Sequence, residues 1–113
     1  MIKLNQWNIP DWLEEKARKR DKYCVYCHVF MKYPPSLQAP RSRNATIEHI
    51  DNDEHNIDES NIAICCNSCN ASKGSKYLLD WFNSQYCMDK GINKETVAPF
   101  IKKHIINILN TPK

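Results

Sequence analysis

The sequence has little of what flexible linkers and membrane spans require. Only two of its 113 residues are glycine, and it contains no internal repeat or low-complexity segment. No run approaches the ~18 apolar residues of a membrane span, and the first residues lack the long apolar stretch of a secretory signal peptide. These absences predict a single small domain over residues 1–113, located in the cytoplasm and without a membrane partner.

A large excess of charge of either sign is also missing. The formal net charge of +3 does not by itself indicate a nucleic-acid partner. Acidic residues crowd positions 48–59, whereas basic residues gather at 16–22 and 41–43. Basic surfaces around an acidic pocket suit a polyanion held over a bound cation, although each patch on its own could equally be a solvated surface. The candidate nucleic-acid contacts are Arg18, Lys19, Arg20, Arg41, Arg43 and Lys76.

The spacing of apolar residues predicts a domain of the α+β class. Helices are expected at about 10–21, 70–86 and 94–109, and strands at 45–50 and around Ile62 and Ile64. Gly74 is a site at which the second helix could break. The apolar stripe of the last helix consists of Val97, Ile101, Ile105 and Ile108. Three prolines mark residues 33–44 as a loop.

Six cysteines are present in a chain expected to stay in a reducing compartment, and four of them form two CxxC pairs. The pairs are Cys24-Val-Tyr-Cys27 and Cys66-Asn-Ser-Cys69. Each pair can present two sulfurs to one ion from a tight turn, and two pairs complete the tetrahedron that zinc prefers. We therefore expect a structural zinc site, which would also help to stabilise a domain with a small core.

Other uses of these cysteines explain less of the pattern. The run from Cys24 to His28 matches the CxxCH motif of c-type haem attachment, but haem attachment leaves the second pair unexplained. Thioredoxin-like redox chemistry requires a βαβ context that is not predicted here, and disulfide bonds would require export. Cys65 and Cys87 remain, and we expect each to be a small buried apolar residue.

Two further stretches contain a histidine that could act as a base and oxygen-bearing residues that could bind a metal. The first lies between the two pairs and holds Thr46-Ile-Glu48-His49-Ile50 and then Asn61. The second follows the second pair as Cys69-Asn70-Ala-Ser-Lys73-Gly74. Hydrolysis of a phosphodiester needs a base near neutral pH, for which histidine is suited, and a divalent cation, for which carboxylate and amide oxygens are suitable ligands. Taken singly, these residues have ordinary explanations, such as Asn70 capping a helix.

In this order the motifs resemble the zinc-bearing branch of the HNH endonuclease family. The resemblance covers about residues 10–82 and leaves the helix at 94–109 as an extension. It implies a small ββα-metal finger with a four-cysteine zinc site, flanked by N-terminal and C-terminal helices. Family members commonly have aspartate in place of Glu48, which changes the reach of the carboxylate but not its charge. Asn70 stands where many members have histidine, a substitution that the family itself shows.

The resemblance also implies roles for individual residues. It implies that Glu48 and Asn70 hold magnesium or manganese, that His49 activates the attacking water, that Asn61 orients the imidazole through a hydrogen bond and that Lys73 steadies a phosphate. Adjacent residues of a regular strand point to opposite faces, so we expect the first strand to end or twist where Glu48 meets His49.

The function implied is that of a divalent-metal-dependent endonuclease that hydrolyses DNA, expected to be double-stranded, leaving a 5′ phosphate and a 3′ hydroxyl. Cutting both strands of a palindrome would imply a homodimer, and a larger phage or restriction assembly is a further expected partner. The alternative is a non-catalytic zinc-knuckle module that binds nucleic acid through residues 16–22 and 41–43.

Overall fold

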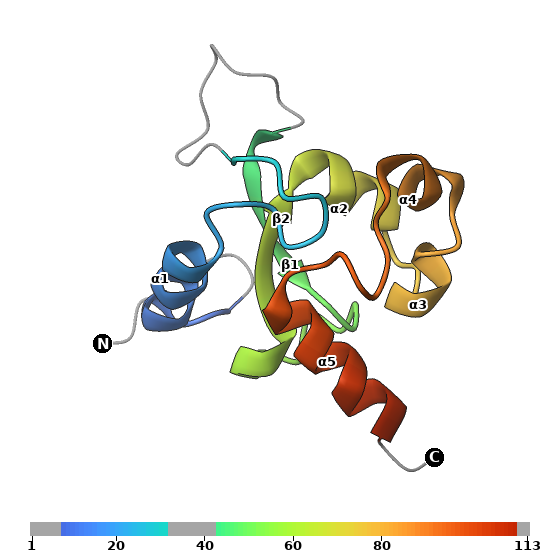
Figure 1. Ribbon diagram of the computed structural model, residues 1–113. Helices are drawn as coiled ribbons and strands as arrows, with labels where there is room; N and C mark the ends of the chain where they lie inside the picture. Colours follow the sequence, from blue (N-terminus) through green and yellow to red (C-terminus); the bar gives the residue numbers. More distant parts are fainter. Residues whose placement is uncertain (1–7, 32–42, 111–113) are drawn as a thin grey trace.

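The computed structural model of the chain describes residues 8–31 and 43–110 (Figure 1). In chain order the elements are α1 Asp11–Arg20, β1 Ala45–His49, the 3₁₀ helix η2 Glu59–Asn61, β2 Ile62–Cys66, α2 Asn67–Lys73, α3 Leu78–Trp81, α4 Gln85–Lys90 and α5 Pro99–Asn110. The predicted α+β class is confirmed. Among the described residues, none of the helices has the length and apolar character that crossing a membrane requires. Most of the loop expected over 33–44 lies outside the described residues.

β1 and β2 form a two-stranded antiparallel sheet that leads directly into α2. Ile47 pairs with Ile64, and His49 pairs with Ile62. β2 is buried along its whole length, in keeping with its unbroken apolar run. α2 begins at the next residue, where the Sγ atom of Cys66 caps the helix by accepting the backbone N–H of Cys69 at 3.4 Å. The sheet and α2 therefore form one continuous unit.

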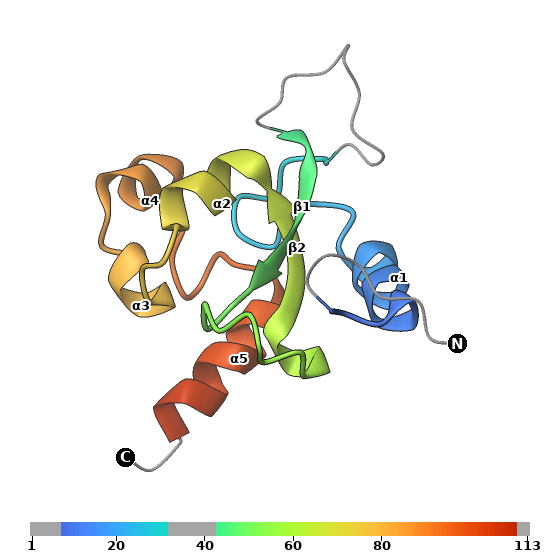
Figure 2. The ribbon, with the colours of Figure 1, turned by 180° about the vertical axis from the view of Figure 1, so that it is seen from behind.

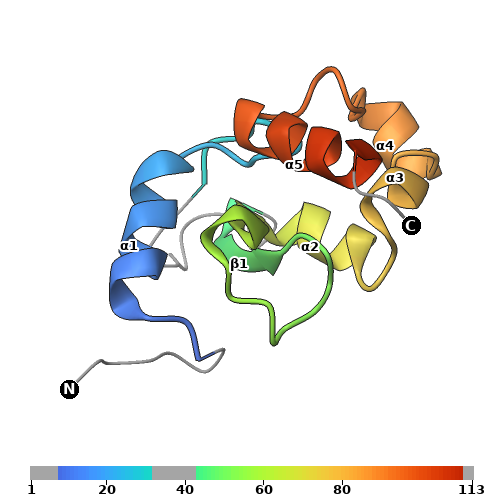
Figure 3. The same ribbon diagram turned by 90° about the horizontal axis from the view of Figure 1, so that it is seen from below.

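The sheet separates α1 from α2, α3 and α4, as Figures 1 to 3 show from three sides. The chain after α1 is held to the outer edge of β2, where the Asp21 carboxylate accepts the backbone N–H of Ile64 at 3.0 Å. The Arg20 guanidinium donates to the carbonyl of Ile62 at 2.9 Å and lies 3.6 Å from the centre of the Phe100 ring. Arg20 thereby supplies a hydrogen-bond donor to a carbonyl on the open edge of β2, and it connects α1 to α5.

The helix expected over 70–86 is interrupted at Gly74, where the sequence allows a break, and again near Ser84, where a break is not expected. Three short helices occupy this region and continue beyond it to residue 90, because the chain turns at Gly74 and again at Ser84. Gly74 adopts φ 51° and ψ −125°, a conformation that side-chain-bearing residues avoid. The hydroxyl of Ser84 accepts the backbone N–H of Cys87 at 3.3 Å and starts α4 as a new helix.

The last helix begins later than the apolar spacing predicts. Asn93 accepts the backbone N–H groups of Glu95 and Thr96 in a side-chain turn, so that α5 starts only at Pro99. Ile101 and Ile105 are buried as expected, and Val97 is buried just before the helix. Ile108 is 42% exposed, because the end of α5 extends beyond the core (Figure 1).

Candidate functional site

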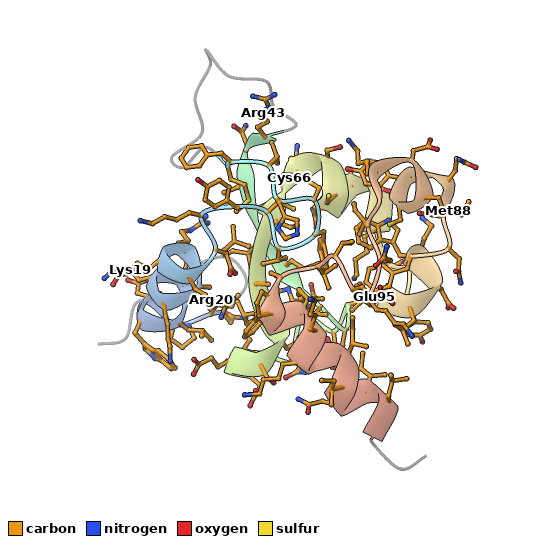
Figure 4. The ribbon with its side chains drawn as sticks, viewed as in Figure 1. Lys19, Arg20, Arg43, Cys66, Met88 and Glu95 are labelled. Carbon is orange, nitrogen blue, oxygen red and sulfur yellow. The ribbon has the colours of Figure 1, made fainter. Side chains whose placement is uncertain are left out.

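The two CxxC pairs meet in one cluster, as their spacing predicts. Cys24 and Cys27 come from the turn after α1, Cys66 ends β2, and Cys69 lies in the first turn of α2 (Figure 4). The four Sγ atoms lie within 4.8 Å of one another, and those of Cys27 and Cys66 are 3.7 Å apart. Four sulfurs at ~2.3 Å from a tetrahedral zinc ion would be ~3.8 Å apart. The cluster can therefore hold a metal ion and fits zinc.

The four thiols differ in how readily each one ionises. Backbone N–H groups of Tyr26 and Cys27 point to the Cys24 sulfur at 3.4 and 3.5 Å. Hydrogen bonding with Cys24 lowers the pKa of Cys27 and of Cys66, whereas shared protons among the four groups raise the pKa of Cys24 and Cys69. Such a set cannot ionise completely alone, because four like charges repel, but a bound dication would neutralise half of that charge.

The remaining cysteines lie outside this cluster. Cys65 and Cys87 are both fully buried, as expected of small apolar residues, and burial raises the pKa of each thiol. His28 is exposed, and its ring Nε2 atom contacts the carbonyl of Thr96. Because all four CxxC sulfurs converge on one point, a shared metal accounts for both pairs, whereas haem attachment would use only the first.

A second group of predicted site residues lines one open pocket of about 210 Å³. Glu48 and His49 come from the end of β1, and Asn70 comes from the middle of α2. The complete lining is Thr46, Ile47, Glu48, His49, Asn52, Glu54, Asn70, Gly74 and Ser75. β1 ends at His49, and the chain turns at once through Asn52, whose φ is 67° and whose backbone N–H donates to the carbonyl of His49 at 2.9 Å. The end of the strand thus allows neighbouring side chains to border one pocket.

Glu48 is a buried carboxylate with two donors on one oxygen. Its side chain is almost completely shielded from solvent, and its Oε2 atom accepts the Tyr26 hydroxyl at 3.0 Å and lies 3.4 Å from the Lys73 ammonium. Burial raises the pKa of Glu48, while the charge of Lys73 and the Tyr26 hydrogen bond act in the opposite direction. Burial has the largest effect, so the pKa of Glu48 stays above its ordinary value, and a bound cation would add to the two donors in favouring the ionised carboxylate.

Lys73 does not have the expected role of a phosphate contact. Its side chain is completely buried, and its ammonium donates to the Asn52 side-chain oxygen at 2.6 Å as well as facing Glu48. The Asn52 amide donates in turn to the carbonyls of Ser75 and Lys76 at 3.1 and 2.9 Å. A place one turn after Asn70 on the helix does not by itself reveal this burial. Lys73 instead connects α2 to Glu48 and to the turn after β1.

His49 is buried at the end of β1, and burial lowers the pKa of its ring. The nearby carboxylates of Asp51, Glu54 and Asp53 partly oppose this shift. A lowered pKa keeps the imidazole neutral at physiological pH, which is the form that accepts a proton.

Asn61 was expected to bond to the imidazole and does something else. Its side-chain oxygen accepts the backbone N–H of Asp51 at 2.9 Å, and its amide donates to the Asp51 carboxylate and to the carbonyl of Asn56, both at 2.9 Å. These three bonds hold the acidic loop that follows β1. Asn61 therefore supports the chain next to His49 rather than the ring itself, because the side chain points along the loop.

The basic residues do not form one surface around the pocket. Arg18 pairs with Glu14 at 2.8 Å and Arg20 with Asp21 at 2.6 Å, so both expected nucleic-acid contacts are engaged within the protein. Lys19 is exposed but belongs to α1, across the sheet from α2 (Figure 4). Lys76 is exposed directly after the pocket residue Ser75, and Arg43 is exposed just before β1. Arg41 lies outside the described residues.

Two contributors to this site were not singled out from the sequence, namely Tyr26 and Asn52. Tyr26 lies between two cysteine ligands, where the CxxC motif places no requirement on residue type. Asn52 lies in an acidic loop, and only its tolerance of positive φ is a local signal. Comparison of the chain with protein-family models, with curated proteins and with solved structures finds no match to any of them.

Proposed function

We propose that this protein is a divalent-metal-dependent endonuclease of the HNH type, in which a zinc ion bound by the four cysteines supports the fold. The observation that carries the proposal is that Glu48, His49 and Asn70 border the same open pocket. A carboxylate, an imidazole and an amide at one open pocket are the groups that metal-assisted phosphodiester hydrolysis needs. Their joint placement also favours catalysis over separate structural roles for each residue.

The proposed mechanism assigns the proton transfer to His49. The neutral imidazole takes a proton from water as the water attacks phosphorus, and the bond from phosphorus to the 3′ oxygen breaks on the opposite side, where that oxygen takes a proton from solvent. Oxygens of Glu48 and Asn70 would hold magnesium or manganese, which supplies a Lewis acid that stabilises charge on the phosphate. Asn61 holds the loop beside His49, and the Lys73 ammonium opposes the effect of burial on the Glu48 carboxyl group.

The proposed substrate is DNA, bound over the pocket from the side that Lys76 borders. An exposed lysine next to Ser75 can contact a phosphate near the pocket. Family resemblance adds the polarity of cleavage, with a 5′ phosphate and a 3′ hydroxyl as products. Whether both strands are cut depends on a second active site, which a homodimer would provide.

The test is a supercoiled-plasmid nicking assay with zinc-loaded protein in magnesium, in manganese and in excess chelator. We expect nicking by the wild type in either metal, and a loss of about 10²- to 10⁴-fold in His49→Ala, because a general base contributes that much to the rate. The matched control is His55→Ala, since the side chain of His55 is 88% exposed in the same acidic loop. Its rate should equal that of the wild type.

The outcome distinguishes the proposal from its alternative. A non-catalytic zinc-knuckle module would retain DNA on a gel in every metal without nicking it. Equal nicking by wild type and His49→Ala would contradict the assignment of the base, provided that circular dichroism shows both proteins to be folded.

A further inference from the structure

The turn that carries the first two cysteine ligands also contacts the proposed catalytic carboxylate. Tyr26 lies between Cys24 and Cys27 and is completely buried. Its hydroxyl donates to the Oε2 atom of Glu48 at 3.0 Å. One residue thus connects the four-cysteine cluster to the pocket, although the cluster and the pocket were predicted as separate features.

Only one of the two Glu48 carboxylate oxygens is contacted by Tyr26 and Lys73. Tyr26 and Lys73 both approach Oε2, at 3.0 and 3.4 Å. Within the described part of the chain, the Oε1 atom of Glu48 has no hydrogen bond or ion pair. Since the Glu48 side chain lines the pocket, this arrangement leaves Oε1 available to a ligand there.

Tyr26 is itself held firmly on both sides. Its ring packs edge-on against Trp81, with ring centres 4.9 Å apart. Its backbone N–H points to the Cys24 sulfur at 3.4 Å, so a metal held by the cysteines would also fix the backbone of Tyr26. The hydroxyl therefore has little freedom to leave Glu48.

We propose that Tyr26 is a positioning residue that fixes the Glu48 carboxylate so that Oε1 faces the divalent cation. This inference rests on the proposed function, because it concerns the cation of that same pocket. Tyr26 acts through Glu48 and does not touch the cation. Outer hydrogen bonds of this kind typically change metal affinity by about 10- to 100-fold when removed.

The experiment measures metal binding directly, without a nuclease assay. Zinc-loaded wild type, Tyr26→Phe and Tyr23→Phe are titrated with Mn²⁺, and free Mn²⁺ is followed by electron paramagnetic resonance. Tyr26→Phe keeps the ring on Trp81 and removes only the hydroxyl, whereas Tyr23→Phe removes a hydroxyl from an exposed ring. We expect a 10- to 100-fold weaker Mn²⁺ affinity in Tyr26→Phe, wild-type affinity in Tyr23→Phe, and the same zinc content in all three.

The outcomes separate this inference from the proposed function. An affinity of Tyr26→Phe within twofold of the wild type, with zinc retained, overturns the positioning role even if the wild type nicks DNA. A weakened affinity supports it even if no protein nicks DNA, in which case only the proposed function fails. If the wild type binds no Mn²⁺, both fail.

A measurement on the wild type covers the case in which Tyr26→Phe loses zinc or unfolds. The Tyr26 ring signals are assigned in nuclear magnetic resonance spectra through their contact with the Trp81 ring. Addition of Mg²⁺ should shift them saturably, because the bound cation polarises the carboxylate that accepts the hydroxyl. Unchanged Tyr26 signals at saturating Mg²⁺ would overturn the proposal.

Discussion

The buried pair of Glu48 and Lys73 allows a quantitative prediction about stability. Removal of one partner leaves the other charge buried without its counter-ion, and this is far more costly than loss of a surface ion pair. Lys73 is completely buried, and its ammonium lies 3.4 Å from Glu48. At an effective dielectric constant of about 20, the gross attraction at this distance is about 5 kcal/mol, part of which offsets the cost of burying both groups.

We therefore expect Glu48→Ala to lower the free energy of unfolding by about 3–5 kcal/mol. Loss of activity with an intact fold is therefore not the expected result for this variant. The cost of leaving Lys73 without its counter-ion is reduced in this variant, because the Asn52 side-chain oxygen still accepts a hydrogen bond from the Lys73 ammonium. The double variant Glu48→Ala with Lys73→Met removes both charges, and its loss should be about 2–3 kcal/mol smaller than the sum of the single losses.

The assay is urea unfolding followed by circular dichroism, at a fixed excess of zinc, because bound zinc contributes to the measured stability. With a slope of roughly 1.5 kcal/mol per molar urea, a loss of 3 kcal/mol lowers the midpoint by about 2 M. Glu54→Ala is the matched control, since Glu54 is an exposed carboxylate of the same pocket. If Glu48→Ala is no more destabilised than Glu54→Ala, or if the coupling is below about 0.5 kcal/mol, the reasoning from burial is refuted.

Two further predictions concern the scaffold. Removal of zinc with a strong chelator should unfold the protein, as should Cys66→Ser, because the four sulfurs lie within 4.8 Å of one another and a shared ion would couple its binding to folding. A chelated protein with unchanged circular dichroism and urea midpoint would contradict this. Gly74→Ala should lower the free energy of unfolding by about 2 kcal/mol and Gly91→Ala by about 1 kcal/mol. The difference arises because Gly91, at φ 69° and ψ 31°, occupies the left-handed helical region that other residues can enter. Gly74, at φ 51° and ψ −125°, lies outside that region. Urea midpoints in the opposite order would refute this explanation.

Local sequence was sufficient for the elements with strong local signals. The first helix, both strands and the burial of Ile101 and Ile105 follow from apolar spacing. The break at Gly74 is indicated by the glycine itself, but the break at Ser84 is not, because the apolar spacing continues through Ser84 although the backbone turns there. Periodicity reports which residues are apolar, but it does not report where the chain reverses direction.

The same contrast applies to the candidate site. Glu48, His49 and Asn70 were assigned to one site from motif order, and they line one pocket. Lys73 and Asn61 do not make the contacts expected of them. The Lys73 ammonium bonds to Asn52, and the Asn61 amide bonds to Asp51 in the loop after β1. A motif specifies residue types and spacing, whereas the direction of a side chain depends on what packs around it.

Local sequence specifies that each CxxC pair offers two sulfurs to a metal, because each pair forms its geometry within a four-residue turn. The α+β class likewise follows from apolar spacing. Packing of the folded chain is what brings the two pairs together, buries Lys73 against Glu48 and connects the cysteine cluster to the pocket through Tyr26. The contacts of Tyr26 and Lys73 with Glu48 join residues 22 to 25 positions apart, and their distances depend on how the turn, the strand and the helix pack together, which local spacing does not encode.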